Sequence, residues 1–265
     1  MAKKGMVANT TLKQSVRVII HNALTSYFKD TLNKENDIEN LVMALVQTES
    51  SFNYEAKGPS IPLVKSSGAR DYFNSTAVSA VYKKGNAQQM SNIEEGLRAW
   101  GLMQVMGWNV VKGGSTAGGG KTEIERARPD LASQLIISPG ESISAKYSGE
   151  ANVLNQILAG LVILESKWKA AKKVDGGWQI GSVIYADRMS CAFRGYIGLG
   201  AVDNGNGGSP ISYVSTIVNG PNYKAANGPG AVYVANKSAE KAAAGPPITV
   251  ASGSKATLPG CVKSA

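Results

Sequence analysis

Residues 36–53 read NDIENLVMALVQTESSFN, and this stretch decides which fold to expect. It opens with Asn36, a residue type that favours the helix N-cap, and Glu39 follows at the spacing of a capping box. Apolar residues then recur at the spacing of one helix face: Ile38, Leu41, Val42, Leu45 and Val46. The pattern predicts an amphipathic helix whose C-terminal end lies near Glu49.

Glu49 is the residue of this stretch that most suggests chemistry. It lies three and four residues beyond Val46 and Leu45, so its carboxyl group is expected to point toward the core at the end of the helix. Burial and the helix dipole both disfavour a negative charge there, and both are expected to raise its pKa, as a general acid requires. The alternative, which periodicity by itself favours, is that the apolar face does not continue as far as Glu49, so that Glu49 lies in solvent after the last turn.

A second stretch, residues 99–105, reads AWGLMQV. Together with ESSFN at residues 49–53 it resembles the lytic transglycosylase family, the SLT-type relatives of goose-type lysozyme, whose members carry E-S-x-F/Y-N at a helix end and G-L-M-Q later. Residues 180–186 (IGSVIYA) resemble the family's third motif, A-x-x-x-Y-N-A-G, although Ala186-Asp187 stands where Asn-Ala-Gly is expected. Residues 212–218 (SYVSTIV) are similar to its late Y-V-x-x-V/I helix.

The resemblance implies a mainly α, lysozyme-like helical domain over residues 35–225. Residues 1–34 are then a helical lead-in, and residues 226–265, rich in Gly, Ala, Lys and Pro, are an irregular C-terminal extension with possible strands or extended arms at 232–234 and 248–250. The interval from Glu49 to Gly101 is longer than the family pattern, so residues 58–97 are expected to form an inserted lobe.

A second amphipathic helix is expected over residues 150–173, with lysines in its last turns and Gly176-Gly177 ending it. Its Glu165 is expected to be an ordinary surface acid. Residues 113–121 are glycine-rich but lack the Walker A spacing, so they are expected to form a flexible loop beside the cleft.

Members of the family cleave the β-1,4 bond between N-acetylmuramic acid and N-acetylglucosamine in peptidoglycan, and the resemblance implies that Glu49 is the acid and base. Ser50 would bind near the catalytic group or the substrate acetamido group, and Gln104 would line the glycan cleft. Met103 would pack against a sugar face, and Tyr185 would orient the Glu49 carboxylate. Core filling by Met103 and a role for Tyr185 as a buried helix aromatic remain equally open.

Two alternatives to transglycosylation also stay open. Hydrolysis, as in goose-type lysozyme or an endolysin, needs a second carboxylate to place a water molecule, and Glu94, Glu95 and Asp187 are the available acids. A structural virion protein that has the lysozyme-like fold without activity would account for the altered Tyr185-Ala186-Asp187 segment.

The amino-acid composition limits which kinds of active site the chain can form. The chain has 265 residues, a net charge of +9, one histidine (His21) and two cysteines (Cys191 and Cys261). A basic surface attracts anionic polymers, and peptidoglycan suits this charge better than nucleic acid because no arginine-rich or aromatic RNA motif is present. Too few ligands exist for a zinc amidase, so neither metal nor cofactor is expected, and Cys191 is expected to be a buried thiol whose pairing with Cys261 stays open.

No apolar run is long enough to span a membrane, and residues 5–11 do not form the apolar region of a signal peptide. An enzyme of this kind then reaches the cell wall by another route. The expected place is a phage particle, as a tail or baseplate component that contacts other virion proteins and acts in the bacterial periplasm and cell wall.

Overall fold

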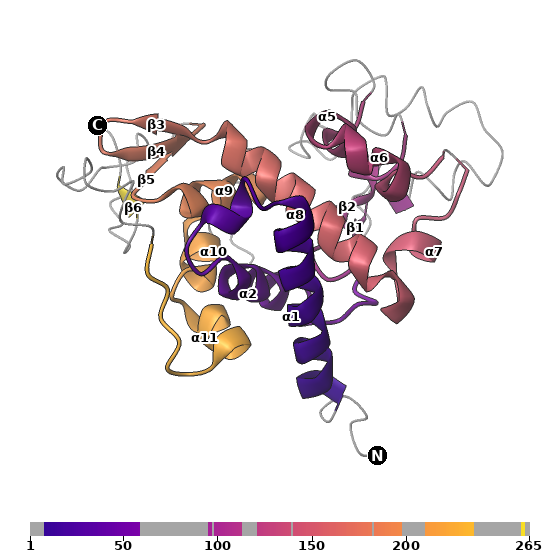
Figure 1. Ribbon diagram of the computed structural model, residues 1–265, viewed down its shortest axis with the longest axis horizontal. Helices are drawn as coiled ribbons and strands as arrows, with labels where there is room; N and C mark the ends of the chain where they lie inside the picture. The colour runs from indigo at the N-terminus through magenta and orange to yellow at the C-terminus, as the bar shows by residue number, and fades with distance from the viewer. Residues whose placement is uncertain are drawn as a thin grey trace, which may run out of the picture. The chain divides into compact units, whose positions relative to one another are not determined.

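The computed structural model describes residues 8–58, 95–96, 98–112, 121–138, 140–181, 183–197, 210–235 and 261–262. Over these residues the protein is mainly helical and carries small sheets (Figure 1). The chain packs into two compact units, which are described separately below. The terminal unit comprises Met1–Thr48 with Leu164–Ala265, and the central unit comprises Glu49–Ile163.

The domain boundaries expected from the sequence stay predictions, namely those of the lead-in, the catalytic domain and the extension. The expected lobe at residues 58–97 lies outside the described residues apart from 58, 95 and 96, and so do residues 113–120 and 248–250. Residues 232–234, which are described, form no strand, although Tyr233 is buried and its N–H donates to Asn219 Oδ1.

The terminal unit starts with α1 (Ala8–Tyr27), a short 3₁₀ helix, η1 (Leu32–Lys34), and α2 (Ile38–Ser50), whose last two residues belong to the central unit. The predicted helix is thereby confirmed. Its entire predicted apolar face is buried: Ile38, Leu41, Val42, Leu45 and Val46. The helix begins after Asp37, whose φ is 58°, and not directly after Asn36.

The rest of the terminal unit combines an antiparallel sheet with three helices. The strands, in spatial order, are β3 (Lys172–Val174), β4 (Gly177–Ile180), β5 (Val183–Tyr185) and β6 (Cys261–Val262). Helix α9 (Arg188–Tyr196) packs on β4, β5 and α10 (Pro210–Ile217), and α10 packs on α11 (Pro221–Asn227) (Figure 1). The late helix expected over residues 212–218 is therefore present as α10.

The sheet corrects two expectations. The long helix α8 (Val153–Ala170) ends before residue 173, because residues 172–174 pair with β4. Asp175 and Gly176 form the intervening turn, and Gly176 and Gly177 have φ of 82° and 149°. Tyr185 lies on a strand and not on a helix. Its short segment is extended because it pairs with Trp178 on one side and with Cys261 on the other.

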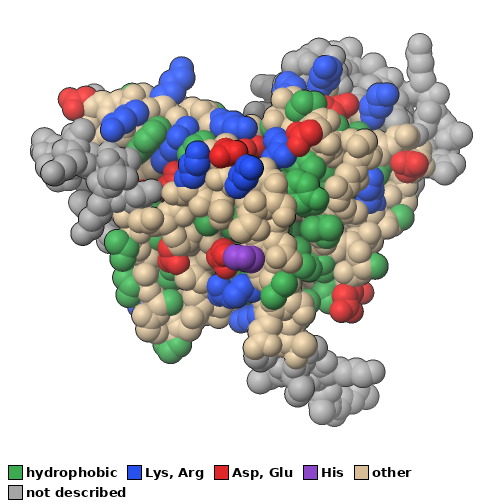
Figure 2. Space-filling view, in the orientation of Figure 1, with side chains coloured by type: hydrophobic (Ala, Val, Ile, Leu, Met, Phe, Trp, Pro, Cys, Tyr) green, Lys and Arg blue, Asp and Glu red, His purple; other side chains and the backbone are tan. Residues whose placement is uncertain are grey.

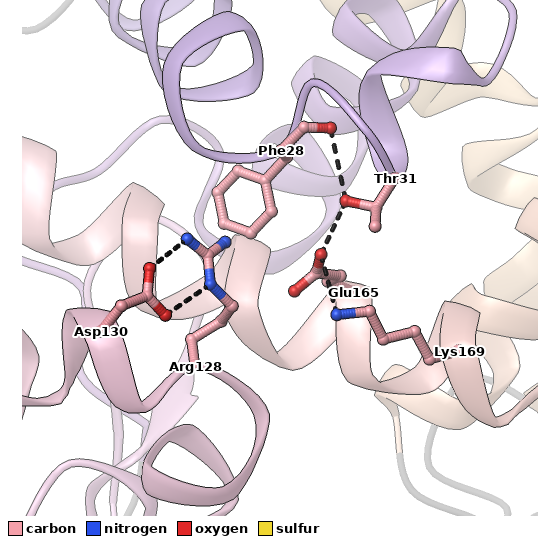
Figure 3. Close-up of polar contacts among 6 residues, drawn as sticks. All are labelled: Phe28, Thr31, Arg128, Asp130, Glu165 and Lys169. Atoms are coloured by element: carbon pink, nitrogen blue, oxygen red, sulfur yellow. Dashed lines mark hydrogen bonds and ion pairs between the residues drawn. The ribbon is translucent and has the colours of Figure 1, made fainter.

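Glu165 is a further correction, because it is only 2% exposed and is not a surface acid. Residues 156–165 of α8 are all buried, so this part of the helix has no solvent face for the acid to occupy. Its Oε1 accepts a hydrogen bond from Thr31 Oγ1 at 2.6 Å and lies 3.1 Å from Lys169 Nζ (Figure 3). The carboxylate thus ties α8 to the turn between α1 and η1.

A second polar network joins α1 to α2 and α11. The Arg17 guanidinium donates to Asn40 Oδ1 on α2 and to Asn227 Oδ1 on α11, both at 2.7 Å. The Tyr223 hydroxyl donates to the Asp37 carboxylate at the start of α2. Helix α11 is therefore fixed by side-chain hydrogen bonds as well as by the burial of Tyr223.

The central unit contains a small antiparallel hairpin and several short helices. The hairpin pairs β1 (Ala99–Trp100) with β2 (Val105–Met106). The helices are η2 (Gly107–Asn109), α5 (Glu123–Ala127), α6 (Pro129–Leu135), α7 (Ser144–Tyr147), η3 (Glu150–Asn152) and the part of α8 up to Ile163. A capping box at Thr122 starts α5, and a bidentate Arg128–Asp130 pair lies at the start of α6 (Figure 3).

The core of the central unit is apolar and includes residues from the hairpin, the short helices and α8. Its fully buried members include Leu102, Met103, Val110, Ile124, Leu135, Ile143, Tyr147, Ile157 and Leu161. Within the described part of the chain, no helix has the length and apolarity that crossing a membrane requires.

Candidate functional site

Glu49 and Ser50 are the last two residues of α2, and both are partly exposed. The chain leaves the helix through two consecutive left-handed residues, Ser51 with φ of 52° and Phe52 with φ of 64°. Non-glycine residues in this conformation each cost about 1–3 kcal/mol and persist where surrounding contacts fix them. Here Phe52 is buried, with 2% of its surface exposed, so its packing holds the turn that directly follows Glu49.

The chain just after the first of the two stretches that carry the family resemblance pairs with the second stretch in the central unit. The segment after Glu49 runs along β1, where Gly58 N donates to Ala99 O at 2.9 Å and Gly101 N donates to Ala56 O at 2.8 Å. A β-bridge pairs Lys57 with Trp100 between these two bonds. Residues 56–58 and 99–101 are therefore held side by side by backbone hydrogen bonds, although the predicted insertion separates them in sequence.

The turn at residues 101–104 depends on glycine at its first position. Gly101 has φ of 69°, and a Cβ atom there would lie 2.6 Å from the Gln156 side chain. Gln104 is also left-handed, with φ of 47°. Its Nε2 donates to Gly101 O at 2.9 Å and to Ala56 O at 3.2 Å, so the side-chain amide closes the turn and links it to the segment after Glu49.

Met103 is fully buried and faces α8. A Cβ atom on Gly160 would lie 2.4 Å from Met103 Sδ and 2.5 Å from its Cβ, so glycine at this helix position allows the turn to approach. In this geometry Met103 fills the core, the role that the sequence left open beside contact with a sugar. The partly exposed residues at this site are Glu49, Ser50 and Gln104.

Gln156 is the residue at this site that sequence reasoning missed. It is 1% exposed on α8, and its Oε1 accepts from Leu102 N at 2.9 Å. Its Nε2 donates to Tyr54 O at 3.1 Å and to Gly149 O at 3.2 Å. The available signal was a polar residue three positions after Val153 and one before Ile157, inside the apolar face of a predicted helix.

Tyr185 belongs to the terminal unit, where its side chain is fully buried. It interacts electrostatically with the Arg194 guanidinium of α9; burial lowers the pKa of Arg194, and Tyr185 partly opposes this shift. Its predicted role in orienting Glu49 stays a prediction, since Glu49 belongs to the central unit.

Two of the acids proposed as a second carboxylate, Asp187 and Glu95, accept hydrogen bonds at helix N-termini. Asp187 caps α9, and its carboxylate accepts from Ser190 N at 2.8 Å and from Ser190 Oγ at 2.6 Å. Glu95 accepts from Ile143 N at 2.6 Å, immediately before α7, and from Ser142 Oγ at 3.0 Å. The capping role of Asp187 gives a physical reason for its presence where the family has Asn-Ala-Gly. Glu94 lies outside the described residues.

The remaining metal-ligating and nucleophilic residue types are dispersed. Among the residues that the structure describes, no three His, Cys, Asp or Glu side chains gather as a metal site would require. His21 Nδ1 lies 2.5 Å from Glu39 Oε1 on an exposed face. Cys191 is buried and its thiol donates to Trp178 O at 2.8 Å, which confirms the expected buried thiol.

No family model, curated protein or solved structure matches this chain. The mainly helical architecture with small sheets is therefore what is established about the fold. Assignment to a lysozyme-like fold rests on the resemblance carried by residues 49–53 and 99–105, and it stays a proposal.

Proposed function

We propose that this protein cleaves the β-1,4 bond between N-acetylmuramic acid and N-acetylglucosamine as a lytic transglycosylase, with a lysozyme-like fold and Glu49 as the acid and base. The observation that carries the proposal is the pairing of residues 56–58 with residues 99–101. A partly exposed carboxyl group at the end of α2 thus lies in the same unit as the turn that the resemblance identifies as part of the glycan site.

One carboxyl group suffices for this reaction. Protonated Glu49 gives its proton to the glycosidic oxygen as the bond to the anomeric carbon breaks, and the N-acetylglucosamine side leaves as an alcohol. The Glu49 carboxylate then removes the proton of the muramyl 6-hydroxyl, whose oxygen attacks the anomeric carbon and closes a 1,6-anhydro ring. The carboxyl group ends protonated, as it began, and no water is consumed.

The hydrogen bonds of the other candidate acids support this route over hydrolysis. Hydrolysis in most glycosidases requires a second carboxylate that is available to activate water. The carboxylates of Asp187 and Glu95 each accept a backbone hydrogen bond at a helix N-terminus, which gives both acids a structural task. The charge of +9 also suits a polymer that carries peptide carboxylates; on the face drawn in Figure 2, Lys and Arg side chains lie among Asp and Glu side chains.

A second candidate function is that of a virion protein without activity. It is favoured by the terminal unit, where Tyr185 is fully buried on a strand and Asp187 is a helix cap. Under either proposal the protein is a component of a phage tail or baseplate that contacts cell-wall glycan and other virion proteins.

The test compares the purified protein with Glu49→Gln in a gel that contains bacterial cell walls. Glu55→Gln is the matched control, because Glu55 is an exposed acid on the segment that directly follows and the substitution changes the charge identically. We expect wild type and Glu55→Gln to clear the gel and Glu49→Gln to lose at least about 100-fold in rate. Equal clearing by all three proteins would exclude Glu49 as the acid, and clearing by none would favour the structural protein.

A further inference from the structure

The buried face of α8 meets the Gly101–Gln104 turn at two positions one helical turn apart. Gly160 leaves room for Met103, and Gln156 contacts Gly101 and bonds to the backbone of Leu102. Since Gln156 and Gly160 are separated by four residues, they lie on the same side of the helix. Helix α8 therefore packs against the turn at Gly101, Leu102 and Met103.

The hydrogen bonds of Gln156 link this turn to the other half of the site. Its amide accepts from Leu102 N and donates to the carbonyls of Tyr54 and Gly149. Tyr54 O also accepts from Gly149 N at 3.2 Å. The oxygen and the two N–H groups of the glutamine amide therefore each have a partner. The side chain is 1% exposed, so these partners come from the protein.

We propose that Gln156 is a positioning residue for the reaction, an inference that rests on the proposed transglycosylase function. It fixes the distance between the Gly101–Gln104 turn and the segment that follows Glu49. The buried amide does not reach a substrate; it sets where a glycan held at the turn lies relative to the Glu49 carboxyl group. A displacement of about 1 Å between a reacting bond and its catalytic group lowers a rate by up to about 100-fold.

The experiment uses the full chain and uncrosslinked glycan strands as substrate. Gln156→Met retains the length and approximate volume of the side chain and removes all three hydrogen bonds. Tyr147→Phe is the control, because it also removes a buried hydrogen bond in the central unit, from the Tyr147 hydroxyl to Leu135 O, and neither residue belongs to the two stretches. Thermal unfolding sets an assay temperature at which every variant is folded.

For Gln156→Met we expect kcat to fall by about 10–100-fold while KM changes by less than about 3-fold. Hydrogen exchange at the Leu102 amide should accelerate by about tenfold or more, because its acceptor is gone. Tyr147→Phe should lower the melting temperature and leave kcat unchanged. If Gln156→Met does not fold, Gln156→Glu, which keeps an acceptor for Leu102 N and removes the amide donors, should show a smaller loss in kcat.

Three results would overturn the inference, and they differ in whether the proposed function falls with it. If the wild type cuts glycan and a folded Gln156 variant has the same kcat, the positioning role is excluded and the proposed function is unaffected. An inactive wild type would remove the proposed function and the positioning role together. Equal losses of kcat in Gln156→Met and Tyr147→Phe would show that reduced stability alone explains the effect.

Discussion

Gln104 shows how one residue takes part in both the fold and the proposed site. The resemblance assigns it to the glycan cleft, and its side chain is partly exposed. Both hydrogen bonds of its Nε2 nevertheless go to backbone carbonyls, those of Gly101 and Ala56. Its left-handed backbone, with φ of 47°, is stabilised by the turn that the same side chain closes. Gln104 therefore shapes the site even before any contact with substrate is considered.

Gly101 should be intolerant of any side chain. Gly101→Ala adds a Cβ at a φ of 69° and 2.6 Å from the Gln156 side chain, so we expect the free energy of unfolding to fall by about 2–4 kcal/mol. Gly140→Ala is the control, since its φ is 100° but nothing lies within 4 Å of the added atom; its loss should be about 1–2 kcal/mol. Urea unfolding measures both values. Similar losses at the two positions would mean that the Gln156 contact is unimportant.

Glu49, Ser50, Met103 and Gln104 were predicted as site residues from residue type and order, and all four belong to the central unit. Their roles in a site stay a prediction. Sequence reasoning did not anticipate the buried carboxylate of Glu165 or the hydrogen bonds of Gln156. Both depend on partners distant in sequence, such as Thr31 and Tyr54, which periodicity along one helix does not reveal.

At the scale of elements, α2 and α8 were predictable because their apolar residues repeat with helical spacing over several turns. The sheet of the terminal unit was missed for a physical reason. Its strands are two to four residues long, too short to show alternation, and β6 comes from the far C-terminal end of the chain. The glycine pair at 176–177 was assigned to a helix end, although the pairing of Lys172–Val174 with Gly177–Ile180 places Gly176 in a hairpin turn and Gly177 at the start of β4.

The contact of α8 with the Gly101–Gln104 turn makes a prediction about coupled substitutions. Gly160→Ala places a Cβ 2.4 Å from Met103 Sδ, which is too close for non-bonded atoms. We expect it to lower the free energy of unfolding by about 1–3 kcal/mol despite the better helix propensity of alanine. Met103→Ala should lower it by about 2–5 kcal/mol.

The double substitution should lose at least about 1 kcal/mol less than the sum of the two single losses, because the shortened side chain relieves part of the clash. Urea unfolding of the four proteins completes the cycle. Strict additivity would show that Met103 does not contact Gly160 in solution.

At the scale of the whole molecule, each unit contains a buried tyrosine whose ionisation is suppressed. Burial raises the pKa of Tyr147 in the central unit. Burial, together with the hydrogen bond to the Asp37 carboxylate, raises the pKa of Tyr223 in the terminal unit. A phenol in the unfolded chain loses its proton near pH 10, and the folded protein holds these protons to higher pH. The folded state therefore binds more protons than the unfolded state above that pH.

Below about pH 9 these two tyrosines should have no effect on how the free energy of unfolding changes with pH. Above about pH 10 each should lower the free energy of unfolding by up to about 1.4 kcal/mol per pH unit. Tyr147→Phe should reduce this slope, because phenylalanine has no proton to lose. Urea unfolding between about pH 8 and 11 tests the prediction. An unchanged slope in the variant would contradict the raised pKa of Tyr147.

Mass spectrometry of the released muropeptides tests most directly whether Glu49 catalyses glycan cleavage without water. Wild-type protein should release fragments that end in 1,6-anhydro-muramic acid, which are lighter by one water than the hydrolysis products, and Glu49→Gln should release none. Reducing ends from the wild type would indicate hydrolysis. Anhydro ends in equal yield from Glu49→Gln would contradict the assignment of Glu49 as the acid and base.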